Sequence, residues 1–68
     1  MSTKLKVLRA EKNLTQEDFA KLMGVKQALV SAWETGRAIP RPAMMQKISD
    51  FFKVPKEEIF FEAFNYSK

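Results

Sequence analysis

Residues 14–36, LTQEDFAKLMGVKQALVSAWETG, decide the fold because they carry the signals of two helices and of the short turn between them. Thr15 is a favourable N-cap, and Asp18 three positions later completes a capping box. Leu14 and Phe19 flank this cap at the spacing of a hydrophobic staple. The pattern therefore predicts that the first of the two helices begins directly after Thr15.

Glycine residues are expected to end both helices. Gly24 and Gly36 can adopt the left-handed conformation that stops a helix abruptly, so the second helix should span about residues 26–35. At about 100° per residue, Val30 centres its inner face and Trp33 lies about 60° away. We expect both side chains to be buried against the preceding helix.

The outer side of the second helix carries mostly short side chains. Two helices joined by a tight turn, the second with such a face, are what the major groove of double-stranded DNA admits. The residues expected to contact bases, here called the recognition face, are Lys26, Gln27, Ala28, Ser31 and Ala32. Gln27 can bind an adenine edge and Lys26 can reach guanine or a phosphate, while the alanine methyl groups can contact thymine methyl groups.

These residues resemble the Cro and phage-repressor type of helix-turn-helix domain, the family also named for the xenobiotic-response-element regulator. The matching residues are Leu14-Thr15-Gln16, Phe19-Ala20, Met23-Gly24-Val25, Val30, Trp33-Glu34, Gly36, Pro40, Ile48, Phe52, Val54 and Ile59. The resemblance covers about residues 5–60 and implies an all-α fold, a compact lambda-repressor-like five-helix bundle whose second and third helices form the helix-turn-helix. It also implies a sequence-specific DNA-binding transcription regulator, a repressor or switch protein of a phage, mobile element or bacterial host. Such a protein acts as a homodimer on a roughly palindromic operator.

The resemblance implies further contacts beside the recognition face. The residues expected to contact phosphates are Gln16, Thr35, Arg37 and Arg41. Arg9 is implied to pair with Glu34, which lies at the edge of the inner face and needs a partner there. A freely solvated Arg9 is the alternative.

The recognition face departs from the pattern of the family in two ways. Lys26 stands where relatives commonly carry a serine or threonine, and the alanines replace polar, often long, side chains. Only Gln27 clearly offers a bidentate contact to a base. Thymine methyl groups and DNA shape are therefore expected to carry part of the discrimination.

Three more helices are expected, at about residues 3–12, 42–53 and 56–62. Their inner faces should contain Leu5 and Leu8 in the first and Met45, Ile48 and Phe52 in the second. Val54-Pro55 separates the last two helices. With 68 residues the chain is predicted to be a single helix-turn-helix domain, residues 1–68, with its core at about residues 3–60.

Charge is distributed unevenly along the chain. Residues 1–41 hold eight Lys/Arg and four acidic residues, whereas residues 42–68 hold four of each. The whole excess of +4 therefore lies in residues 1–41, which contain the recognition face, and this suits a surface that faces phosphates. A set of solvated lysines is the alternative interpretation.

The composition argues against an enzyme, a metal site and a cofactor. Histidine and cysteine are absent, so thiolate and imidazole ligands and the usual general base are missing. The two glycines cannot form a phosphate-binding loop. Residues 1–12 contain no apolar core of signal-peptide length and no apolar run reaches membrane-spanning length, so we expect a soluble cytoplasmic protein without a membrane partner.

The C-terminal residues 61–68 are rich in aromatic side chains. Phe61, Phe64 and Tyr66 are expected to form a dimer contact, although Phe61 can equally complete the core. The alternative function is a protein-interaction module on the same scaffold, such as an antitoxin that binds a toxin. Leu29 and the aromatic segment would then form the surface for the protein partner.

Overall fold

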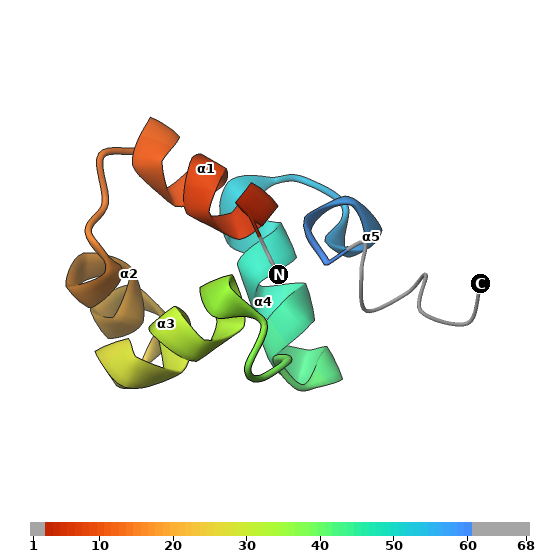
Figure 1. Cartoon of the computed structure of the whole chain (residues 1–68). Helices are drawn as coiled ribbons and strands as arrows, with labels where there is room; N and C mark the ends of the chain where they lie inside the picture. The colour runs from red at the N-terminus through yellow and green to blue at the C-terminus, as the bar shows by residue number, and fades with distance from the viewer. Residues whose placement is uncertain (1–2, 61–68) are drawn as a thin grey trace.

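The computed structural model describes residues 3–60, and the regular secondary structure within them is helical (Figure 1). The five helices within it are α1 (Thr3–Glu11), α2 (Gln16–Met23), α3 (Gln27–Thr35), α4 (Pro42–Phe52) and α5 (Lys56–Ile59). These bounds and the absence of strands in the described region confirm the all-α prediction. The fifth helix ends at Ile59 rather than near residue 62, and Phe60 follows it as the C-cap.

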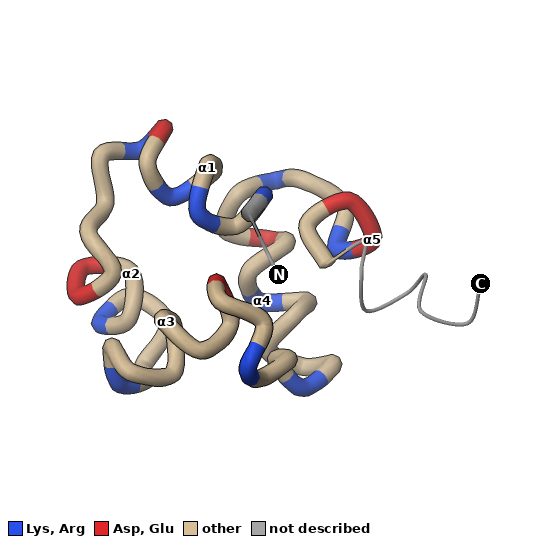
Figure 2. The backbone as a smooth tube through the Cα atoms, in the orientation of Figure 1, with Lys and Arg blue, Asp and Glu red and all other residues tan. Residues whose placement is uncertain are grey.

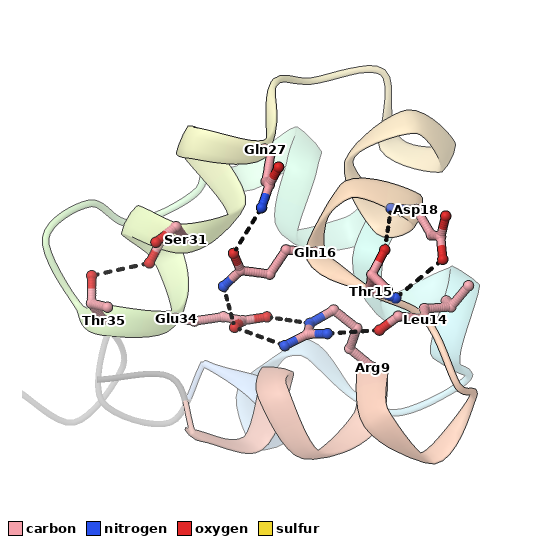
Figure 3. A network of polar contacts seen from close by, with 9 residues as sticks. All are labelled: Arg9, Leu14, Thr15, Gln16, Asp18, Gln27, Ser31, Glu34 and Thr35. Carbon is pink, nitrogen blue, oxygen red and sulfur yellow. Dashed lines mark hydrogen bonds and ion pairs between the residues drawn. The ribbon is translucent and has the colours of Figure 1, made fainter.

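The start of α2 has the predicted capping box. Thr15 Oγ1 accepts from the Asp18 amide at 3.0 Å, and the Thr15 amide donates to Asp18 Oδ2 at 3.2 Å (Figure 3). Gly24 ends α2 in the left-handed conformation with φ 76°, and Gly36 ends α3 with φ 84°. The local signals of residues 14–36 therefore fix both the length of α2 and α3 and the short turn between them.

The buried faces of α2 and α3 pack against each other. Phe19, Ala20 and Met23 of α2 are buried, as are Val30 and Trp33 of α3. The small Ala20 side chain lets the two helices approach closely. The predicted inner face of α3 is confirmed, and its opposite side is directed away from the core.

The rest of the core comes from α1, α4 and α5. Its buried residues are Leu5, Leu8, Met45, Ile48, Phe52, Ile59 and Phe60. Phe52 stacks on Phe19 with ring centroids 5.4 Å apart, and Phe51 meets the Phe52 ring edge-on at 5.0 Å. The residues of α1, α4 and α5 therefore pack against the buried sides of α2 and α3. Burial of aromatic rings is among the largest stabilising contributions to this core.

None of the helices within residues 3–60 has the length and apolar character needed to span a lipid bilayer. The same residues contain no group of acidic side chains arranged to hold a metal ion.

Candidate nucleic-acid interface

The recognition face lies on the outer side of α3 and is open to solvent. Lys26, Gln27 and Ala28 are exposed, while Ser31 and Ala32 are half-buried. The alanine side of the helix is therefore accessible within the monomer, as a helix that enters a DNA groove requires.

Positive charge lies at the start of α3 and beyond its end. Figure 2 shows Lys and Arg positions at the start of α3 and along the connection between α3 and α4. Arg37 and Arg41, the two arginines of that connection, are both exposed. Arginine side chains in such positions can reach phosphates on either side of a groove.

The structure brings part of the expected phosphate-contact set together at the end of α3. Arg37 donates from Nε to Thr35 Oγ1 at 3.3 Å. Thr35 in turn donates to the backbone oxygen of Ser31 at 3.0 Å (Figure 3). These bonds hold the two side chains at one end of the recognition face. Arg41 lies further along the connection, as the N-cap of α4.

Arg9 and Glu34 form the ion pair implied by the resemblance. Arg9 donates from Nε to Glu34 Oε2 at 2.7 Å and from Nη2 to Oε1 at 3.2 Å. Its Nη1 also donates to the backbone oxygen of Leu14 at 2.6 Å. The two side chains are only 12% and 4% exposed, so Arg9 is not freely solvated. The pair connects α1 both to α3 and to the segment that precedes α2.

Gln16, one of the residues expected to contact a phosphate, makes two side-chain hydrogen bonds within the protein. It is half-buried and donates from Nε2 to Glu34 Oε1 at 3.0 Å. Its Oε1 accepts from Gln27 Nε2 at 3.4 Å (Figure 3). A phosphate contact from Gln16 is still a prediction, and it would have to use the second N–H of the amide.

Sequence reasoning missed the two hydrogen bonds of Gln16. Gln16 and Gln27 are the first residues of α2 and α3, and their long side chains meet between the two helices, with Gln27 Nε2 3.4 Å from Gln16 Oε1. Two long amides at equivalent positions of neighbouring helices were the available signal. Glu34 and the other buried polar side chains of the described region all have hydrogen-bond partners.

The α3 N-terminus lacks a side-chain cap. Lys26 is the N-cap, with φ −83° and ψ 151°, and within the described structure its side chain makes no capping hydrogen bond. The backbone amides of the first turn therefore have no side-chain acceptor, and that of Leu29 donates instead to the Lys26 backbone oxygen at 3.0 Å. This end of α3 combines a lysine with donor groups that suit an anion.

An apolar depression lies beside the recognition face. It is lined by Leu29, Trp33, Ile39, Pro40, Arg41 and Met44. Leu29 is 39% exposed and Ile39 is 62% exposed, so apolar atoms reach the solvent here. The other expected contact residues, Phe61, Phe64 and Tyr66, lie outside the described residues.

Comparison with known proteins relates this chain to helix-turn-helix proteins. The profile of a helix-turn-helix family matches residues 5–59. An HTH-type transcriptional regulator of Methanocaldococcus jannaschii is 47% identical over 60 residues, which cover 88% of this chain and 91% of the relative.

Two further relatives are longer proteins. The HTH-type transcriptional activator BcrR of Enterococcus faecalis is 41% identical over 82% of this chain, which corresponds to 28% of that protein. The HTH-type transcriptional repressor RghR of Bacillus subtilis is 37% identical over 87% of this chain and 44% of its own length. No solved structure gives a significant match.

Proposed function

The chain belongs to the helix-turn-helix family whose profile it matches over residues 5–59, and we propose that it is a transcription regulator that binds double-stranded DNA through α3. The observation that carries this proposal is the two-sided character of α3. Val30 and Trp33 anchor one side in the core, while Gln27 and Ala28 remain exposed on the other. A helix held in this way can enter a major groove without rearrangement of the fold.

The contacts divide into two kinds. The recognition face would contact base edges, while Thr35, Arg37, Arg41 and the second N–H of Gln16 would contact phosphates. Phosphate contacts release counterions and set the affinity, whereas base contacts set the sequence preference. No catalytic group is needed for this activity, and the lack of histidine and cysteine in the sequence agrees with a protein that is not an enzyme.

The names of the relatives support regulation of transcription but differ in its direction. One of the reported relatives is named a repressor and another an activator. A repressor or switch protein in the cytoplasm is the interpretation that follows from the resemblance to phage repressors.

Binding as a homodimer to a roughly palindromic operator is a further part of the proposal. A two-fold dimer would place two α3 helices about 34 Å apart, one turn of B-DNA. Sedimentation over a range of protein concentrations tests the dimer, and a strict monomer at high micromolar concentration contradicts it.

The central experiment is selection of bound sequences from a random duplex pool, followed by affinity measurements over a range of salt concentrations. A consensus sequence should emerge, and log Kd should rise linearly with log salt concentration because bound phosphates release counterions. A protein that binds no duplex at low salt would contradict the DNA-binding function.

A second candidate function has one observation in its favour. The apolar depression around Leu29 and Ile39 offers a surface for another protein, as an antitoxin offers to its toxin. The same salt titration separates the two candidates, because only the first requires binding to duplex DNA that weakens steeply with salt.

A further inference from the structure

Hydrogen bonds link the buried ion pair to the recognition face through Gln16 (Figure 3). Gln16 donates from Nε2 to Glu34 Oε1 at 3.0 Å, and Gln27 donates from Nε2 to Gln16 Oε1 at 3.4 Å. Glu34 is almost fully buried, whereas Gln27 is exposed at the start of α3. A buried carboxylate is therefore connected to the amide that is best suited to bind a base.

The direction of these hydrogen bonds is determined at Glu34. A carboxylate that accepts from Arg9 offers only acceptor atoms to its other neighbours. Gln16 must therefore turn its amide nitrogen toward Glu34 and its amide oxygen toward Gln27. That oxygen can only accept, so Gln27 faces it with its own nitrogen, as the 3.4 Å bond shows.

We propose that Glu34 is a positioning residue for base recognition, because it determines which amide atoms of Gln27 remain available to DNA. This inference rests on the proposed DNA-binding function. With one N–H bound to Gln16, Gln27 keeps its second N–H and its oxygen. A donor beside an acceptor matches N7 and the N6 amino group of adenine, whereas guanine presents two acceptors, N7 and O6. Glu34 thereby favours adenine over guanine at the base that Gln27 contacts.

The substitution Glu34→Gln isolates this effect, since it keeps the shape of the side chain and replaces one oxygen by an NH2 group. Arg9 makes its shorter bond, 2.7 Å, from Nε to Oε2, and its longer bond, 3.2 Å, from Nη2 to Oε1. We therefore expect the amide oxygen of the new glutamine to take the place of Oε2 and its NH2 group to take the place of Oε1. The new NH2 group then faces Gln16, whose amide must reverse. Gln27 in turn accepts with its oxygen and presents two N–H donors, the pattern that matches guanine.

The experiment first locates the base position concerned. Selection from a random duplex pool with the wild type and with Gln27→Ala identifies the position at which the preference depends on Gln27. Competition binding then compares duplexes with adenine and with guanine at that position. The wild type should prefer adenine by about tenfold, and Glu34→Gln should abolish or reverse this preference.

Two more variants separate base selection from stability. Arg9→Lys weakens the ion pair but leaves the carboxylate in place, so it should lower the melting temperature and keep the adenine preference. Gln16→Ala breaks the connection and lets the Gln27 amide rotate, which should remove most of the preference. Because Gln16 is only half-buried, this variant decides the question even where Glu34→Gln does not fold.

The outcomes are distinct. If Glu34→Gln folds and keeps the adenine preference of the wild type, the role of Glu34 is overturned, while the proposed DNA binding is not affected. The same holds if Gln16→Ala keeps the adenine preference. Loss of the preference in Arg9→Lys as well would show an effect of destabilisation and would overturn it too. If the wild type and Gln27→Ala show the same base preference at every position, the role of Glu34 is overturned as well. A wild type that binds no duplex at low salt overturns the proposed function itself.

Discussion

Arg9 of α1 donates to Glu34 of α3 at 2.7 Å across 25 positions of sequence, and this ion pair joins the first helix to the recognition helix. Arg9 also donates to the backbone oxygen of Leu14, directly before the cap of α2. One guanidinium therefore connects α1, α3 and the start of α2, and it does so behind the recognition face. Both side chains are largely withdrawn from water, so removal of one partner leaves the other without compensation.

The first prediction concerns the contribution of this pair to stability. Arg9→Ala should lower the free energy of unfolding by about 3 kcal/mol, because it leaves a buried carboxylate unpaired. For a domain of this size each kcal/mol corresponds to a fall of about 4–8 °C in melting temperature. Thermal unfolding followed by circular dichroism measures the shift.

Lys6→Ala is the matched control, since Lys6 is an exposed cation on the same helix and should cost less than about 0.5 kcal/mol. Lys12 is a poorer control because its Nζ lies 5.7 Å from the centroid of the Phe51 ring. Equal small shifts for Arg9→Ala and Lys6→Ala would show that the pair does not stabilise the fold.

The second prediction concerns the turn between α2 and α3. Gly24 has φ 76°, and a Cβ built there meets no atom within 4 Å. Gly24→Ala should therefore cost only the strain of a left-handed residue, about 1–2 kcal/mol, with the fold retained. Gly24→Asn should cost less, because asparagine tolerates this conformation better. Urea denaturation measures both, and an alanine variant as stable as the wild type would disprove the strain.

The capping and glycine signals explain why so much of the fold could be predicted. Thr15, Asp18 and Gly24 act on backbone groups within a few residues of themselves, so their spacing alone locates the ends of α2. The inner faces follow from helical periodicity for the same reason. Val30 and Trp33 are buried where the periodicity places them.

The parts that could not be predicted depend on contacts between separate elements. The hydrogen bonds of Gln16 require particular conformations of side chains from α2 and α3 at once. The apolar depression depends on the path of residues 36–41, which places Ile39 near Leu29. Phe51 of α4 joins the aromatic cluster through its contact with Phe19 of α2, with ring centroids 5.9 Å apart. The periodicity of apolar residues along one helix contains no information about these contacts between helices.

The third prediction concerns the uncapped start of α3. Lys26→Ser should add an acceptor for the first-turn amides and raise the free energy of unfolding by about 1 kcal/mol. The same change removes a cation beside the recognition face, so DNA affinity should fall and the salt slope should decrease by about one unit. Lys26→Ala is the control, because it removes the charge without supplying a cap. A serine variant no more stable than the alanine variant would argue against the capping effect.

The fourth prediction separates base contacts from phosphate contacts. Gln27→Ala should relax the preference at one base position, because Gln27 is the recognition-face residue whose amide can offer an N–H and an oxygen to one base edge together. Arg41→Ala should instead weaken binding to all duplexes similarly and reduce the salt slope by about one unit. Fluorescence anisotropy with the selected duplex and its single-base variants, at several salt concentrations, measures both effects.

Lys53→Ala provides the control for the loss of one charge, since Lys53 is the exposed C-cap of α4, at the opposite end of that helix from Arg41. It should change the affinity much less than Arg41→Ala, because the phosphate contact requires a cation next to α3 and not merely net positive charge. If the two charge variants weaken binding equally, the attraction is spread over the whole molecule. If Gln27→Ala also weakens all duplexes alike, the amide contacts the backbone of the DNA, and the assignment of base contacts to the start of α3 is wrong.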